Sequence, residues 1–202
     1  VIPNPIFLPV EGVPERRREE ITKTVVSAGR LDNLQKRCDI MLQAFTIFSR
    51  THPEYTLRII GDGPDEEKMH FWCREFNIED KVCFWGKSSH VMRDIVNDGI
   101  FLITSDFEGI SNSLLEAMVL GLPCVSTDHS PGGGRFLITD HENGLLVPTG
   151  DAQKAAEALS EFADDPELAQ RCGEKAQMVR ERFAPDKVIA EWDAYLTHIC
   201  NS

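Results

Sequence analysis

Residues 100–127 constrain the fold more than any other part of the chain. Two apolar runs, residues 100–103 and 123–127, are typical of buried parallel strands. Between them, apolar residues recur at helical spacing, and Gly121-Leu-Pro123 ends the helix that this spacing predicts. The stretch therefore predicts a strand, a polar turn, a helix and a second strand, the repeating unit of a parallel sheet covered by helices.

Two glutamates flank the polar turn, Glu108 just before Gly109 and Glu116 inside the helix. In open parallel sheets, ligands bind beyond the carboxyl ends of the strands, and a helix beginning near Ser111 or Asn112 directs unpaired N–H groups there. Gly109 has no Cβ, so the backbone can come close to a ligand. Because a carboxylate accepts two hydrogen bonds at once, Glu108 is a candidate for binding a sugar and Glu116 for binding a ribose.

A purely structural interpretation of the two glutamates is also open at this point. Ser113-x-x-Glu116 matches a capping box, in which Glu116 only reaches back to the first amide of the helix. Glu108 is equally consistent with a solvated loop carboxylate. One strand-turn-helix unit does not choose between these interpretations.

The rest of the chain repeats the alternation of strands and helices. Strands are predicted over residues 24–28, 56–60, 82–86 and 144–147, with helices between them. From Asp151 the pattern becomes helical, over about 151–163, 166–182 and 185–199. We therefore predict an α/β fold, a Rossmann-like doubly wound parallel sheet with a C-terminal helical tail.

Two cations follow the first predicted strand, Arg30 and Lys36. Their loop lies at the carboxyl end of a strand, where the ligand crevice is expected. An Arg and a Lys there are suited to clamp a diphosphate, although an ordinary exposed pair fits the same pattern. Cations are unfavourable near a helix N-terminus, which favours the functional interpretation.

Two glycine-rich segments add weaker signals. Gly61-Asp-Gly63-Pro64 lacks the third glycine of a dinucleotide fingerprint, so it predicts either close passage of a nucleotide or only a tight turn. Three successive glycines lie within residues 128–135. We interpret them as amides facing an anion or as a loop that moves, and not as a packing feature.

Composition excludes several classes of function. The formal net charge of −12 argues against a nucleic-acid surface, and no apolar run is long enough to span a membrane. The six cysteines, Cys83 among them, form no CxxC pair, which predicts buried thiols in a reducing compartment. The six histidines form no HExxH motif, and we predict no metal site.

The chain is expected to have three parts. Residues 1–23 are predicted to be an interdomain linker followed by a solvated charged segment, and residues 24–183 the ligand-binding domain. Residues 184–202 are predicted to be a C-terminal helix. The two early prolines and the absence of a signal peptide lead us to expect a piece of a longer chain.

These motifs together resemble the C-terminal, nucleotide-binding domain of retaining glycosyltransferases of the GT-B type, in the large family four. Glu108 and Glu116 are separated by seven residues, which resembles that family's E-x7-E motif, and Gly29-Arg-Leu with Lys36 resembles its diphosphate-binding segment. Similar matches cover nearly the whole chain: Gly61-Asp-Gly-Pro, Phe84-Trp-Gly, Asn143-Gly-Leu-Leu-Val-Pro, the initial Val1-Ile-Pro-Asn-Pro and the last helix with Trp192.

The resemblance implies a role for each matching residue. Arg30 and Lys36 would hold the diphosphate and stabilise its growing charge, Glu116 would bind the ribose, and Glu108 would bind the sugar. The implied catalytic set is Arg30, Lys36 and Glu108. The implied donor-binding set is Gly29, Gly61, Gly63, Gly86, Gly109, Ile110, Ser111, Asn112, Ser113, Leu114 and Glu116.

The resemblance also implies the reaction and its partners. The family transfers sugars with retention and without a bound metal or separate cofactor. The matching residues resemble members that transfer a hexose or N-acetylhexosamine from a UDP-sugar to a glycan or lipid-linked acceptor in bacterial polysaccharide assembly. The acceptor and any membrane surface would be reached through an N-terminal domain missing here, in a cytoplasmic protein.

Two departures and three alternatives accompany this interpretation. Arg37 stands where many members have glycine, and residues 135–138 lack an acidic residue common there. A UDP-sugar epimerase of GT-B architecture, which needs no acceptor, and a noncatalytic doubly wound interaction module are the main alternatives. A nicotinamide-dependent oxidoreductase is disfavoured by Pro64.

Overall fold

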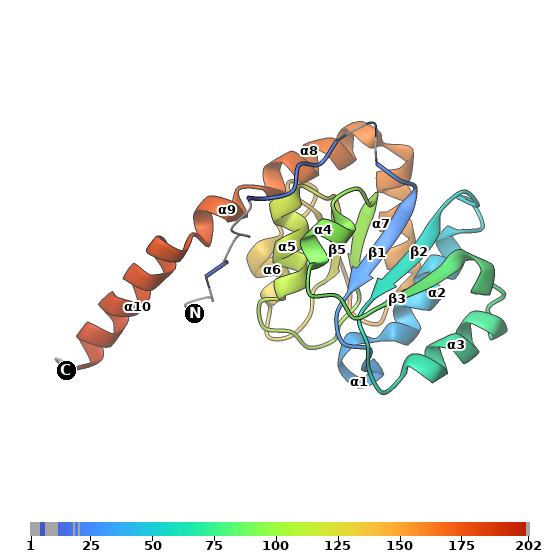
Figure 1. Cartoon of the computed structure of the whole chain (residues 1–202), viewed down its shortest axis with the longest axis horizontal. Coiled ribbons are helices and arrows are strands. Elements are labelled where there is room, and N and C mark those ends of the chain that lie inside the picture. Colours follow the sequence, from blue (N-terminus) through green and yellow to red (C-terminus); the bar gives the residue numbers. More distant parts are fainter. Residues whose placement is uncertain (1–4, 7–11, 18, 20, 201–202) are drawn as a thin grey trace.

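The computed structural model describes residues 5–6, 12–17, 19 and 21–200. Within them a single parallel sheet has the strand order β3-β2-β1-β4-β5-β6 (Figure 1). This is the order of a doubly wound dinucleotide-binding fold, so the predicted fold class is confirmed. The strands are β1 (Thr24–Ala28), β2 (Thr56–Ile60), β3 (Val82–Gly86), β4 (Ile100–Ile103), β5 (Cys124–Thr127) and β6 (Leu145–Val147).

Helices cover both faces of this sheet and extend beyond it. Most follow a strand and lead to the next, as the alternating sequence pattern predicts. They are α1 (Asn33–Lys36), α2 (Cys38–Phe48), α3 (Glu66–Glu75), the 3-10 helix η2 (Glu79–Lys81), α4 (Val91–Ile95), α5 (Asn112–Leu120), α6 (Gly133–Leu137), α7 (Ala152–Asp164), α8 (Pro166–Ala176), α9 (Val179–Arg182) and α10 (Pro185–Cys200).

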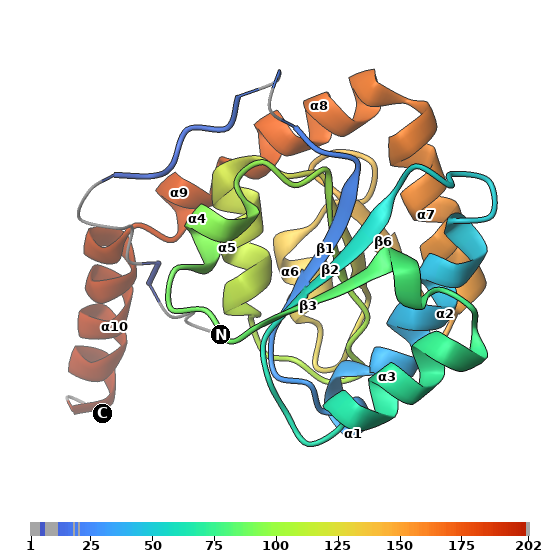
Figure 2. The same ribbon diagram turned by 45° about the vertical axis from the view of Figure 1, so that its right-hand side comes forward.

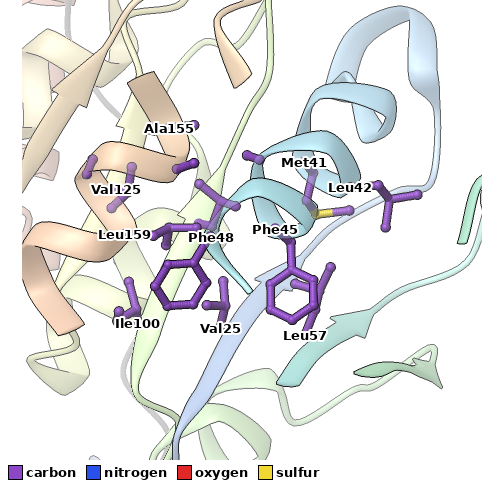
Figure 3. Close-up of a cluster of buried hydrophobic side chains, with 14 of the residues drawn as sticks. Val25, Met41, Leu42, Phe45, Phe48, Leu57, Ile100, Val125, Ala155 and Leu159 are labelled. Atoms are coloured by element: carbon purple, nitrogen blue, oxygen red, sulfur yellow. The ribbon is translucent and has the colours of Figure 1, made fainter. Parts of the chain in front are cut away.

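One core lies between the sheet and helices α2, α3 and α7 (Figure 3). Its largest fully buried side chains include Phe45 and Phe48 of α2, which are both essentially inaccessible to solvent. They contact β1, β2, β4 and α7 through the labelled residues of the figure, such as Val25 and Leu159. The helical spacing of the α2 residues and the alternation along the strands direct these side chains to one place.

A second core lies on the other face, under α4, α5 and the end of α8. Successive residues of β4 alternate between the two cores: Leu102 belongs to the first, and Phe101 and Ile103 to the second. All four residues of β4 are buried, as are all four of β5. β4 is therefore a continuous apolar run, whereas β5 ends in the buried polar residues Ser126 and Thr127.

The predicted helix over residues 166–182 is wrong in its continuity, because α8 ends at Ala176 and α9 begins at Val179. The break lets two side chains cap the end of α5. Gln177 donates to the Leu120 carbonyl at 3.4 Å, and the Arg180 guanidinium donates to the Val119 carbonyl at 2.6 and 2.9 Å. Orphan carbonyls at a helix end need such partners, and a continuous helix would not place both donors there.

The charged segment before β1 is not purely solvated, which corrects the prediction for Arg16. Its guanidinium donates to the carbonyls of Val96 and Asp98, at 2.8 and 2.6 Å, and so anchors the segment beside the start of β4. Glu15 and Glu19 are exposed, as predicted. A cavity of about 420 Å³ lies nearby, at the amino ends of the strands and away from the expected ligand crevice.

Helix α10 projects away from the sheet (Figures 1 and 2). Only Val188 on it is buried, whereas Ile189, Trp192 and Leu196 of its predicted apolar face are 40–52% exposed. None of the helices in the described ranges combines the length and the apolarity needed to cross a bilayer.

Candidate functional site

The candidate site lies where the strand order reverses, between β1 and β4. The chain leaves β1 toward α2 on one face and leaves β4 toward α5 on the other, so the loops that follow these strands separate at their carboxyl ends. Ligands of doubly wound folds bind at such a point. Residues 29–37 and 104–111 form its two sides.

Hydrogen bonds join these two loops into one unit. The Asp106 amide donates to the Gln35 carbonyl at 3.0 Å, and the Gln35 side chain donates to the Phe107 carbonyl at 3.0 Å. The Thr104 hydroxyl donates to the carbonyls of Lys36 and Arg37, at 3.0 and 3.1 Å. Gln35 and Thr104 were not identified from the sequence, because no local pattern predicts a contact between the two loops.

Arg37 occupies a backbone conformation that favours glycine. Its φ and ψ are 50° and 53°, in the left-handed region, which explains why a glycine would suit this position. The guanidinium donates to Asp39 at 3.0 Å and to Asp106 at 2.8 Å, and these hydrogen bonds raise the pKa of Arg37. The departure from glycine is therefore accompanied by two ion pairs.

The structure brings two of the predicted catalytic residues into contact. The Lys36 ammonium forms an ion pair with the Glu108 carboxylate, and their side chains are only 20% and 11% exposed. The Ser105 hydroxyl also donates to Glu108, at 3.3 Å. Gly29 lies directly beside this pair, since a Cβ there would be in ordinary contact with the Lys36 Nζ, at 3.6 Å. A cation and a carboxylate thus meet at the reversal point of the sheet.

Arg30 lies on the open side of the same loop. Its side chain is exposed and has no hydrogen-bond or ion-pair partner among the residues that the structure describes. Together with Gly29, Gly61, Gly63, Lys87 and Ser88 it lines a hollow of about 480 Å³ at the ends of β1, β2 and β3. A free guanidinium at such a hollow is suited to an anionic ligand.

Gly61 and Gly63 have a packing role in addition to lining this hollow. A Cβ on Gly61 would lie 1.9 Å from the Gly29 carbonyl oxygen, and one on Gly63 would lie 2.3 Å from the Leu31 carbonyl oxygen. The two glycines therefore let the loop after β2 press against the loop after β1. Gly86 at the end of β3 has a φ of +81° and open space beside it.

Helix α5 begins as predicted, with Ser111 as its N-cap. The Ser111 hydroxyl accepts from the Leu114 amide at 3.4 Å and lies 3.2 Å from the Ser113 hydroxyl. The capping-box alternative is wrong, because Ser113 lies inside the helix and its hydroxyl caps no amide. Leu114 is fully buried with its amide engaged, so this predicted donor-binding residue has no group left for a ligand.

Glu116 lies one turn into α5 with a free carboxylate. It is half-buried and, within the described ranges, accepts no hydrogen bond and forms no ion pair. Burial raises the pKa of Glu116. Of the remaining predicted binding residues, Gly109 and Asn112 are exposed and Ile110 is half-buried. The start of α5 therefore offers accessible backbone and one unpartnered carboxylate.

The glycine-rich loop corrects a prediction, because its glycines do serve packing. A Cβ on Gly133 would lie 1.6 Å from the Gly109 carbonyl oxygen, and one on Gly134 would lie 2.6 Å from the Thr127 carbonyl oxygen. Gly133 and Gly134 are buried and open α6, and Gly132 has a φ of +112°. The loop therefore packs against the turn at Glu108 through the close contact of Gly133 with Gly109.

His129 lies in the same loop and was not a predicted site residue. Its side chain is only 1% exposed, and burial lowers its pKa against the opposing influence of Glu108. Neither ring nitrogen has a hydrogen-bond partner in the part of the chain that the structure describes. The sequence drew attention to residues 128–135 as a segment and gave this histidine no role of its own.

The cysteines and histidines are dispersed. Cys38, Cys73, Cys124 and Cys172 are buried free thiols, but Cys83 is exposed on the edge strand β3, which corrects its expected burial. The described residues contain no group of three or more His, Cys, Asp or Glu side chains that could hold a metal ion.

Comparison with known proteins identifies the family. Residues 13–179 match the family model of the glycosyl transferases group 1. The chain belongs to this family. The match includes β1 to β6 and every residue of the candidate site described above.

Curated relatives of this group 1 chain are longer proteins. An exopolysaccharide phosphotransferase of Streptomyces coelicolor is 34% identical over 191 residues, which are 93% of this chain and 20% of that protein. The lipopolysaccharide 1,6-galactosyltransferase of Escherichia coli is 34% identical over 167 residues, covering 79% of this chain and 45% of that protein. The chain thus spans less than half the length of both.

Solved structures with a similar fold confirm the architecture. The apo form of the lipopolysaccharide outer core galactosyltransferase WaaB matches with a TM-score of 0.81 and 29% identity, over 98% of this chain and 55% of that one. HepE from Anabaena, in complex with UDP-glucose, matches with a TM-score of 0.79 and 21% identity, over 88% and 49%. The second likeness shows the fold alone.

Proposed function

We propose that this chain is the donor-binding half of a retaining glycosyltransferase, which transfers a hexose or N-acetylhexosamine from a UDP-sugar to a glycan or lipid-linked acceptor. The observation that carries the proposal is the Lys36–Glu108 pair at the reversal point of the sheet, whose two loops also carry the free side chain of Arg30 and lead to Glu116 on α5. A cation pair for a diphosphate and two carboxylates for hydroxyls are the groups that a nucleotide sugar requires.

Each side chain then has one task. Arg30 and Lys36 hold the diphosphate and stabilise the charge that grows on it as the glycosidic bond breaks. Glu116 accepts from the ribose hydroxyls and Glu108 from the sugar hydroxyls, while the exposed backbone around Gly109 and α5 lies beside the sugar and phosphates. With these cations at the diphosphate, the reaction proceeds without a metal or separate cofactor, as the resemblance implies.

The relatives support the sugar-transfer part of the proposal. The Escherichia coli relative is named a galactosyltransferase, and a Campylobacter jejuni relative, 28% identical, is named as acting on a diphospho-undecaprenol acceptor. HepE was solved with UDP-glucose. The same proposal includes an N-terminal domain that binds the acceptor and on which α10 packs. It places the whole protein in the cytoplasm, with peripheral contact to the cytoplasmic face of the membrane.

A calorimetric titration with UDP, GDP, ADP and NAD tests the proposed function. Among these four ligands we expect UDP to bind most tightly. We expect UDP-sugars, titrated separately, to bind more tightly than UDP. Preference for GDP or ADP would move the donor to another nucleotide, and preference for NAD would contradict sugar transfer. Conversion of a UDP-sugar without acceptor by the longer parent protein would favour the epimerase alternative.

Changing Glu116 to Gln is expected to weaken UDP binding about tenfold and to leave pyrophosphate binding nearly unchanged. Gln keeps one acceptor oxygen but loses the charge, so a hydrogen bond of about 1.5–3 kcal/mol becomes one of about 0.5–1.5 kcal/mol, a difference near the value of a tenfold change. Because Glu116 has no partner in the described structure, this change should not unfold the chain. Equal losses for UDP and pyrophosphate would contradict a ribose contact.

A further inference from the structure

His129 is held beside Glu108 by the backbone. Beyond the sheet, residues 106–108 pair with Ser130 in a short parallel extension. The Ser130 amide donates to the Asp106 carbonyl at 3.0 Å, and the Glu108 amide donates to the Ser130 carbonyl at 2.9 Å, with Phe107 bridged to Ser130. Side chains alternate along such segments, so exposed Phe107 and Ser130 share one face, and Glu108 and His129 share the other.

The imidazole of His129 packs against the first two residues of α6. A Cβ on Gly133 would lie 3.0 Å from its Cε1, and one on Gly134 would lie 3.5 Å from its Nε2. The Gly133 position also meets the Gly109 carbonyl oxygen, so the ring and the turn at Glu108 both pack against Gly133. The first glycines of α6 therefore fix His129 directly against the turn that carries Glu108.

The unused hydrogen-bonding capacity of this ring is unusual. A neutral imidazole carries one N–H donor and one acceptor, and buried polar atoms nearly always have partners. Among the described residues, both nitrogens of His129 lack one. Burial favours the neutral ring, and the Glu108 carboxylate and then the Glu108 backbone act against this, although no backbone atom of Glu108 lies in hydrogen-bond geometry with the ring. An unsatisfied N–H of a neutral ring thus lies near the Glu108 carboxylate, which the Lys36 ammonium already contacts.

Ligand binding changes the demand on Glu108. This step rests on the proposed function, in which Lys36 binds the diphosphate. Lys36 is also the cation that pairs with Glu108 in the described structure. When Lys36 contacts the diphosphate, Glu108 loses its charged donor and keeps only the Ser105 hydroxyl at 3.3 Å. A carboxylate that must accept from sugar hydroxyls in a fixed orientation then needs another donor.

We propose that His129 is a positioning residue that supplies this donor. In the ligand-bound state its ring N–H donates to the Glu108 carboxylate and holds it in place for the sugar hydroxyls, while Lys36 binds the diphosphate. His129 acts through Glu108 and does not touch the ligand. Its contribution therefore concerns the sugar and not the nucleotide.

The test compares UDP with UDP-glucose and UDP-N-acetylglucosamine by calorimetry, in the whole chain. The readout is the ratio by which the better UDP-sugar binds more tightly than UDP. His129→Phe keeps a planar ring without hydrogen bonds. We expect it to bind UDP with the affinity of the wild type and to lower this ratio about tenfold. His129→Asn and His129→Gln place an amide N–H near Nδ1 or Nε2, and one of them should restore most of it.

A Glu108→Gln reference separates the two levels of the proposal. If the wild-type chain binds no nucleotide, or if Glu108→Gln keeps the full ratio, the proposed donor site fails and this inference fails with it. If Glu108→Gln loses the ratio but His129→Phe keeps it, only the role of His129 is overturned. Parallel losses of melting temperature and UDP affinity in all three His129 variants would also overturn it, since they indicate a merely structural residue.

Discussion

Replacing Lys36 with Met is expected to weaken UDP binding about a hundredfold. The ammonium is largely enclosed, with 20% of the side chain exposed, so its interaction with a diphosphate is poorly screened by solvent. A charge-assisted hydrogen bond contributes about 1.5–3 kcal/mol, and about 2.7 kcal/mol corresponds to a hundredfold change in affinity. Pyrophosphate should lose a similar factor, because the lost contact is with phosphate.

Lys154 provides the matched control for this substitution. It is a surface lysine on α7, 56% exposed, and its ammonium is 2.7 Å from the Glu157 carboxylate. Lys154→Met removes the same charge without approaching the candidate site, so UDP affinity should stay within twofold of the wild type. A similar loss in both variants would show that net charge, and not a bound diphosphate at Lys36, determines the affinity.

Gly133→Ala is expected to produce the largest loss of stability among single-methyl additions in this loop. The new Cβ would lie 1.6 Å from the Gly109 carbonyl oxygen, and both groups belong to the backbone. Overpacking of this kind costs about 3 kcal/mol, or about 6–12 °C in melting temperature for a domain of this size. Relief of the collision must displace the Glu108–Gly109 turn, so the preference for UDP-sugar over UDP should also fall.

Gly109→Ala tests the other side of the same contact. An added Cβ on Gly109 has no heavy atom within 4 Å, and its backbone needs no left-handed conformation. Its melting temperature should remain close to that of the wild type when measured by calorimetric scanning. If both substitutions lowered the melting temperature equally, the stability of this loop would not depend on the contact between Gly133 and Gly109.

The strands of this fold were predictable because each is defined by local properties. The β4 run is apolar throughout, and β5 begins with apolar residues, since both faces of these central strands are covered. The position of Arg30 followed in the same way, because the residue after a parallel strand lies at the ligand end of the sheet. The burial and spacing of single segments carried these predictions.

Features that depend on two distant segments were not predictable from the pattern. The sequence suggested that Gly133 and Gly134 belong to a mobile or anion-binding loop. The carbonyl groups of Gly109 and Thr127, which leave no space for a side chain at these positions, lie elsewhere in the chain. The break between α8 and α9 has a similar origin, since its donors serve the end of α5. His129 carried no signal because an unsatisfied ring nitrogen is a property of its surroundings.

The left-handed backbone at Arg37 has a consequence for how this chain can change over evolutionary time. A non-glycine residue there costs about 1–2 kcal/mol, which the guanidinium offsets through Asp39 and Asp106. Loss of Asp106 first would remove part of this compensation and leave only Asp39, whereas Arg37→Gly first removes the strain together with the ion pairs. The two positions are therefore coupled, and the order in which substitutions arise decides which of them are tolerated.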